Sequence, residues 1–85
     1  MRRESKDVRA IPLWLLRDYL VAIGGRATGD HDVDGEGWRA RLTQIEDYTI
    51  GSLAVGQVRL DFEGDEAAVA ALLAALEPKL LRAGG

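Results

Sequence analysis

The sequence contains no cysteine and a single histidine, His31. Without thiols the chain forms no disulfide, has no cysteine nucleophile and offers no sulfur ligand to a metal. One histidine also excludes a multi-histidine metal centre within one chain. We therefore expect no cofactor. The absence of cysteine fits a reducing compartment, and we predict a cytoplasmic protein.

The chain also lacks an excess of positive charge, since its formal net charge is −3 at pH 7. Binding to nucleic acid needs a basic footprint, so we expect no nucleic-acid partner. The longest apolar run, AAVAALLAAL at residues 67–76, is too short to cross a bilayer, and no secretory signal pattern is present. We therefore expect no membrane partner either.

What remains is an ordinary globular composition in a short chain. The 85 residues are 47% hydrophobic, which predicts one folded domain over residues 1–85. A core of this size supplies only about 3–5 kcal/mol of net stability. A homodimer or another protein partner is therefore expected to supplement it.

Two segments have the three-to-four periodicity of amphipathic helices. Pro12 suits the first helical position, and the apolar stripe that follows ends at Gly24-Gly25, which predicts a helix over about residues 12–24. Asp65 is a good N-cap for the alanine-rich run that follows it, which predicts a second helix. Pro78 should kink or end that helix.

Between these helices the apolar residues alternate with polar ones. Residues 38–43 and 57–63 show the two-residue period of half-buried strands, and another strand is expected between 48 and 55. The apolar parity shifts across Gly56, which predicts a β-bulge there. Residues 6–10 are expected to form a short edge strand. The element order predicts an α+β fold.

The stretch GDHDVDGEGW, residues 29–38, fits two structures. A calcium-binding loop places carboxylates at alternate positions before a glycine, as this stretch does with Asp30, Asp32, Asp34 and Gly35. The twelfth position of such a loop should be a bidentate glutamate, but here it is Arg41. The three aspartates are therefore weak metal candidates.

The second structure is a β-hairpin that turns at Asp34-Gly35, because Asp-Gly is among the strongest two-residue turn signals. In this register His31 faces Trp38 on the apolar side, and Asp30 faces Arg39 on the charged side. One register thus separates apolar from polar residues and matches opposite charges. We favour the hairpin and predict no metal site.

No recognisable motif points to catalysis. Neither Ser5 nor Ser52 lies in a nucleophile elbow, and no phosphate-binding glycine loop is present. Glu46 and Asp47 precede Tyr48, but adjacent residues of a strand point to opposite faces, so these carboxylates cannot readily cooperate. We predict no catalytic residues and a non-enzymatic protein.

The sequence ends in Gly84-Gly85, as the tails of ubiquitin-like sulfur carriers do. Carriers need an extended tail that enters an activating enzyme, and in them the tail leaves a strand of a β-grasp fold. Here the pair follows a predicted helix. We therefore favour Gly84 as the residue that ends the helix and Gly85 as a frayed end, with the sulfur carrier as a lesser alternative.

Over residues 8–83 the sequence resembles the C-terminal domain of MoaD-related proteins, which are relatives of the small subunit of molybdopterin synthase. The resemblance rests on a few phrases, which are PLWLLRDYL with Gly24-Gly25, Glu46-Asp47-Tyr48, and Val55-Gly56. It implies a TBP-like fold, a curved antiparallel sheet with two helices packed on its concave face in the order β-α-β-β-β(-β)-α. It also implies a link to molybdopterin (molybdenum cofactor) biosynthesis.

The family arrangement has a preceding β-grasp domain, which we do not expect in this protein, so we expect the domain to act alone or in trans. Our leading hypothesis is an accessory or interaction module whose partners include molybdopterin synthase components. The alternative is a small-molecule-binding domain with a pocket between sheet and helices. The residues expected to line that pocket are Trp14, His31, Trp38 and Tyr48, although large aromatics more often serve the core. A binder should contain a sizeable cavity, and an interaction module should show a filled core and an exposed apolar patch.

Overall fold

The computed structural model describes residues 1–84 of the chain, and the side chains of residues 1–81. Its elements in chain order are β1 (Arg2–Arg9), α1 (Leu13–Ala22), β2 (Arg26–Ala27), β3 (Asp32–Gly35), β4 (Trp38–Ile50), β5 (Leu53–Gly64) and α2 (Glu66–Gly84). Within this part of the chain, no helix is both long and apolar enough to cross a membrane.

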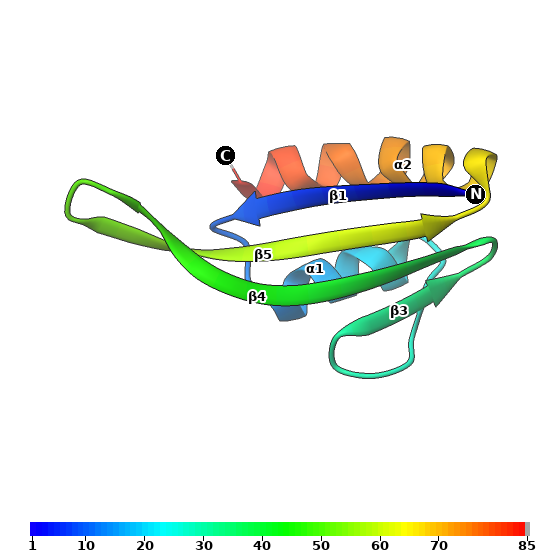
Figure 1. Ribbon diagram of the computed structural model, residues 1–85, viewed down its shortest axis with the longest axis horizontal. Coiled ribbons are helices and arrows are strands. Elements are labelled where there is room, and N and C mark those ends of the chain that lie inside the picture. Colours follow the sequence, from blue (N-terminus) through cyan, green and yellow to red (C-terminus); the bar gives the residue numbers. More distant parts are fainter. Residues whose placement is uncertain (85) are drawn as a thin grey trace.

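The five strands form one antiparallel sheet in the order β1-β5-β4-β3-β2, so that β1 and β2 are its edges. Both helices pack on the same face, with α1 against β2, β3 and β4, and α2 against β1 and β5 (Figure 1). The other face of the sheet is open. The predicted α+β class and its two helices are confirmed.

The first helix matches its prediction closely. Pro12 stands at the N-cap of α1, and Gly24 follows its end with a φ of 111°. The Gly24 N–H donates to the Val21 carbonyl at 3.1 Å, which bonds one of the last helical acceptors. A glycine is favoured at such a backbone angle because it has no Cβ.

The second helix begins as predicted but continues further than Pro78. The Ala68 N–H donates to Oδ2 of Asp65 at 3.4 Å, as expected for an N-cap. Proline removes the donor for the carbonyl four residues earlier, at Ala74. Both Pro78 and Ala74 are exposed, so water can bond that carbonyl, and α2 runs on to Gly84. Of the two expected effects of Pro78, a kink or an end of the helix, the end is wrong.

The core lies between the sheet and the helices. It is built from side chains that are less than a tenth exposed: Val8, Ile11, Leu16, Leu20, Val33, Ala40, Leu42, Val58, Leu60, Phe62, Val69, Leu72 and Leu76. No polar side chain is buried among those that the structure describes. The helix stripes and the alternating strand residues therefore face one another, as their periods predict.

The strand between the N-terminus and α1 is longer than predicted. We expected residues 6–10, whereas β1 spans Arg2–Arg9 and pairs with β5 along its whole length.

The predicted bulge is present, but its extra residue is in β4. Ile45 faces Gln57 and Tyr48 faces Val55, so Glu46 and Asp47 together oppose Gly56.

The predicted hairpin exists, but the register predicted for it is wrong. Asp34 pairs with Arg39 and Gly35 with Trp38, so the turn is Glu36-Gly37, not Asp34-Gly35. Since the slip involves an even number of residues, each side chain keeps its predicted face.

Tertiary packing explains the choice of turn. The observed register places buried Val33 opposite buried Ala40 on the core face, where the predicted one placed Gly29. It also lets the Trp38 indole cover Gly35, at a place where any side chain would collide with it.

Candidate functional site

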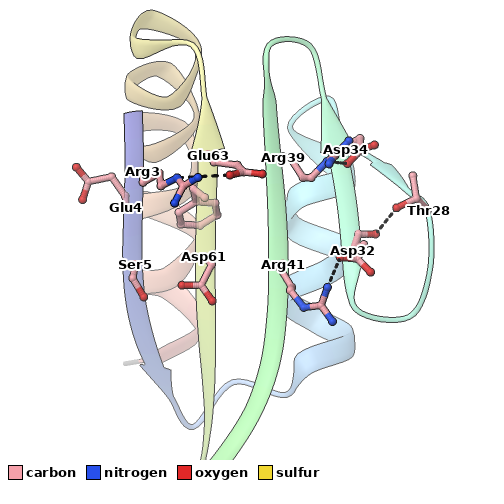
Figure 2. Close-up of a pocket in the computed structure, with 11 residues that line it drawn as sticks. Arg3, Glu4, Ser5, Thr28, Asp32, Asp34, Arg39, Arg41, Asp61 and Glu63 are labelled. Carbon is pink, nitrogen blue, oxygen red and sulfur yellow. Dashed lines mark hydrogen bonds and ion pairs between the residues drawn. The ribbon is translucent and has the colours of Figure 1, made fainter. Parts of the chain in front are cut away.

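The open face of the sheet has rows of alternating charge. One row crosses all five strands, and its members in order of strand position are Arg3, Glu63, Arg39, Asp34 and Arg26. Within this row Nε of Arg3 lies 3.7 Å from Oε2 of Glu63, and Nε of Arg39 lies 3.1 Å from Oδ1 of Asp34 (Figure 2). Neighbours on adjacent strands therefore attract one another across the sheet.

A second row lies beside the first and includes Asp61, Arg41, Asp32 and Thr28. Nη1 of Arg41 lies 3.6 Å from Oδ1 of Asp32, and the Thr28 hydroxyl donates to the Asp32 carbonyl at 3.3 Å. Both rows, except Arg26, line an open depression of about 700 Å³ (Figure 2). Its arginines already lie in ion pairs with acidic neighbours, which makes the depression a poor site for an anionic ligand.

The strongest ion pair of this face is at the β1 edge. Nε of Arg59 lies 2.9 Å from Oδ1 of Asp7, and its Nη2 lies 3.4 Å from Oδ2. The hydrogen bond from Arg59 lowers the pKa of Asp7 below its ordinary value of 3.8, and the same bond raises the pKa of Arg59. The pair is geometrically bidentate, and its side chains are partly exposed, at 48% for Arg59 and 40% for Asp7.

The Asp7→Asn variant tests this pair through pH. Because the pKa of Asp7 is depressed in the folded state, its contribution is present above 3.8 and is lost as pH falls through the folded value. We expect wild type to melt at a slightly higher temperature than Asp7→Asn at neutral pH, and the gap to close well below pH 3.8. A melting difference that is the same at both pH values would contradict the assignment.

The three aspartates considered as metal ligands are each paired with an arginine. Asp30 faces Arg17 at 3.7 Å, Asp32 faces Arg41 at 3.6 Å, and Asp34 faces Arg39 at 3.1 Å. Among the residues that the structure describes, no group of three histidine, cysteine, aspartate or glutamate side chains is placed to hold a metal ion.

The four residues expected to line a pocket are dispersed. Trp14 lies on α1 and is 57% exposed, while Trp38 packs over Gly35 at one end of the core. His31 is exposed, and its Nδ1 lies 3.2 Å from the carbonyl oxygen of Leu42, because the observed register moves it away from Trp38.

Tyr48 lies on the part of β4 beyond the bulge. None of these four residues lines the charged depression or a smaller groove between β1 and α2, and core side chains fill the space between the sheet and the helices.

A projecting hairpin, which we call the arm and define as residues 48–55, stands where one separate strand was expected. That expectation is wrong, because β4 continues to Ile50 and β5 begins at Leu53. β1 ends opposite Gln57 and β3 begins opposite Arg41, so the outer parts of β4 and β5 pair only with each other. Figure 1 shows the arm extending beyond the rest of the sheet. At its tip Ile50 is 62% exposed and Leu53 is 70% exposed. The signal in the sequence was an apolar pair around Gly51-Ser52 with no helix left to cover it.

The base of the arm is fixed by side chains from three strands. The guanidinium carbon of Arg9 lies 3.6 Å from the centre of the Tyr48 ring, a cation–π contact. Nε of Arg9 also donates to Oε1 of Gln57 at 3.0 Å, and Nε2 of Gln57 donates to the Glu46 carbonyl at 3.3 Å. The arm is thus an apolar tip held on an anchored base.

Removing Arg9 should loosen the arm without unfolding the domain. In Arg9→Ala we expect amide hydrogen exchange within residues 46–55 to become faster, while the strand centres keep their protection. Arg26→Ala is the control, because it removes an exposed arginine from the other edge strand. Equal exchange in the arm for both variants would contradict an anchoring role for Arg9.

The last described element of the chain is α2, which includes Gly84. The predicted frayed end at Gly85 lies outside the described residues. Where Gly84 is described, its backbone belongs to a helix and not to an extended tail.

These observations define a two-layer α+β domain with a charged open face and a projecting arm. The chain belongs to the archaeal MoaD-like protein family, whose sequence model matches residues 4–85. No curated protein sequence matches it. The match to the family model confirms the predicted relationship to MoaD.

Proposed function

We propose that this chain is a non-enzymatic interaction module that contacts a protein of molybdopterin biosynthesis through the arm. The observation that carries the proposal is the exposure of Ile50 and Leu53 at the tip of a hairpin whose base is anchored. When a partner buries exposed apolar side chains, the free energy of the complex falls. Because the element is pre-organised, little conformational entropy is lost on binding.

The filled core favours an interaction module over a binder of small molecules. Among residues 1–81, thirteen buried hydrophobic residues fill the space between sheet and helices, and the larger depression lies on the opposite, charged face. Trp14, which is 57% exposed, adds a second apolar contact on α1. This helix begins at the end of the sheet from which the arm projects (Figure 1).

Membership of the archaeal MoaD-like family supports the link to molybdopterin synthesis. We propose molybdopterin synthase components as the partners and the cytoplasm as the location. We further propose that the fold is TBP-like, because one helix follows β1, the other follows β5, and both cover one face of a sheet ordered β1-β5-β4-β3-β2. The family relationship supports the proposed pathway, and the exposed arm supports the proposed contact surface.

The test is binding of the purified domain to molybdopterin synthase subunits by calorimetry. We expect Ile50→Ser combined with Leu53→Ser to weaken binding by at least about tenfold, since each apolar side chain contributes about 1.5–3 kcal/mol when fully buried. Leu81→Ser is the matched control, because Leu81 is 71% exposed on α2, outside the arm.

Three outcomes would refute the proposal in different parts. Absence of binding by the wild-type domain would refute the pathway link. Equal loss in Leu81→Ser and the arm variant, or undiminished binding by the arm variant, would refute the arm as the contact surface.

A further inference from the structure

The β1 edge of the sheet has a backbone that can pair with another strand. β1 pairs with β5 on one side only. In the same register the Ala10 N–H donates to the Gly56 carbonyl at 2.9 Å. Bonding alternates along an antiparallel strand, so even-numbered residues of β1 bond to β5. Arg3, Ser5 and Asp7 therefore direct their N–H and C=O groups outward, away from the sheet.

The charges along this edge are complementary to those of a second copy of β1 that runs antiparallel to it. Residues 3–7 read Arg-Glu-Ser-Lys-Asp. When two copies run antiparallel with Ser5 opposite Ser5, the first arginine faces the last aspartate, and the glutamate faces the lysine, in both directions. Every charged residue of the segment then meets an opposite charge on the other copy. The same register pairs the outward-pointing backbone groups of odd-numbered residues with one another, so charge and hydrogen bonding select one alignment.

The rows of the open face continue across such a junction. Arg3 already lies 3.7 Å from Glu63, and Asp7 lies 2.9 Å from Arg59. Joining Arg3 of one copy to Asp7 of the other gives the order Glu63, Arg3, Asp7, Arg59, with alternating sign throughout. No like charges are brought together, which distinguishes this edge from one whose charges only prevent aggregation.

A groove beside the same edge supplies apolar surface on the helix side. It measures about 270 Å³ and lies between β1 and α2, with Glu4, Lys6, Leu73 and Leu80 among its lining residues. Both leucines are partly exposed in the single chain. A second copy placed against β1 brings its own α2 to this side, so that the two helices can bury these leucines.

We propose that β1 is a self-association edge and that two copies of this chain join there about a two-fold axis at Ser5. The two five-stranded sheets then become one continuous sheet, with an isologous interface. The occupant of the edge is a second copy, because the charge sequence that it must match is its own. This interface is separate from the arm and does not rest on the proposed pathway.

Sedimentation equilibrium over a range of concentrations tests the proposal. We expect wild type to reach twice the 9.2 kDa mass of one chain. Lys6→Glu places two like-charged pairs in the interface and should raise the dimer dissociation constant at least about tenfold. Arg26→Glu, which makes the same charge change at the opposite edge, should leave dimerisation unchanged. Circular dichroism checks that both variants fold.

A charge exchange makes the test specific to the register. Glu4→Lys alone should also dissociate, whereas an equimolar mixture of Glu4→Lys and Lys6→Glu should form heterodimers, because opposite charges then meet again. A wild-type chain that is monomeric throughout, or that is dissociated by Arg26→Glu and not by Lys6→Glu, would overturn the proposal. So would a mixture that stays monomeric while wild type dimerises.

Cross-linking locates the axis. Residues facing each other in a hydrogen-bonded antiparallel pair have Cα atoms about 5.5 Å apart, within the range of a disulfide. Since the chain has no cysteine, Ser5→Cys should form covalent dimers under mild oxidation, and Ser52→Cys at the arm tip should not. Faster cross-linking through Ser52→Cys would overturn the assignment. The assignment would also be overturned if the Ser5→Cys variant captured an added β1 peptide, and did so only with the peptide parallel to β1.

Discussion

Phe62→Ala is expected to destabilise the domain by about 3–5 kcal/mol in the free energy of unfolding. Phe62 is 2% exposed and is the largest of the fully buried side chains. It lies on β5, between Glu4 of β1 and Ala40 of β4, and packs in the layer that the helices cover. Its removal leaves a cavity that neighbouring strands cannot close without breaking their pairing. Urea denaturation measures the change.

Two further substitutions keep this prediction interpretable. Phe62→Leu retains most of the apolar volume and should cost less than about 1.5 kcal/mol, so it reports on the site even if the alanine variant is unfolded. Ile50→Ala removes a side chain that is 62% exposed and should change stability by less than about 0.5 kcal/mol. Equal losses at Phe62 and Ile50 would contradict the placement of the core.

Gly64→Ala is expected to have the second large effect, a loss of about 2–5 kcal/mol from backbone strain and overpacking combined. Gly64 ends β5 with a φ of 151°, a conformation that residues with a side chain rarely adopt. A Cβ there would collide with the Gly37 carbonyl oxygen and lie 2.7 Å from the Trp38 Cα. These contacts are backbone atoms of the neighbouring turn, which cannot move aside without opening the hairpin.

Gly56→Ala is the matched control on the same strand. Nothing lies within 4 Å of the position that its Cβ would occupy. Alanine there should be neutral or should stabilise the fold by about 0.4–1 kcal/mol, because it restricts the unfolded chain. Thermal melts of the two variants should therefore move in different directions or by very different amounts. A Gly64→Ala protein as stable as wild type would show that the turn packs differently.

Local patterns predicted most of the architecture. The helix that starts at Pro12 and the helix capped by Asp65 follow from periodicity and end signals that lie within a few residues of each other. The alternation of residues 57–63 predicted which side chains of β5 point to the core, and Val58, Leu60 and Phe62 are buried as that pattern requires. Such features depend on neighbours in sequence, so sequence alone was sufficient.

The register of the β3–β4 hairpin could not be predicted in this way. Asp34-Gly35 and Glu36-Gly37 both offer a glycine to a tight turn. The choice depends on the burial of Val33 and on the close approach of Trp38 to Gly35, which are contacts of the folded sheet. The predicted matching of opposite charges is confirmed, since aspartates of β3 face arginines of β4. The individual pairs differ from those predicted.

The arm was missed for a related reason. The alternation in β4 and β5 indicates strands but does not say where their neighbours stop. β1 ends before the arm because the chain must turn into α1, and β3 does not reach the arm because it is only four residues long. The exposure of Ile50 and Leu53 follows from those endings, which are properties of other segments.

We propose the arm as the surface through which this domain contacts its partner. The most direct measurement is an NMR titration of the isotope-labelled domain with molybdopterin synthase subunits. We predict that the largest amide shift changes fall within residues 48–55, with smaller ones near Trp14. Changes centred on the charged open face, or an unchanged spectrum at saturating subunit concentrations, would show that the arm is not the contact surface.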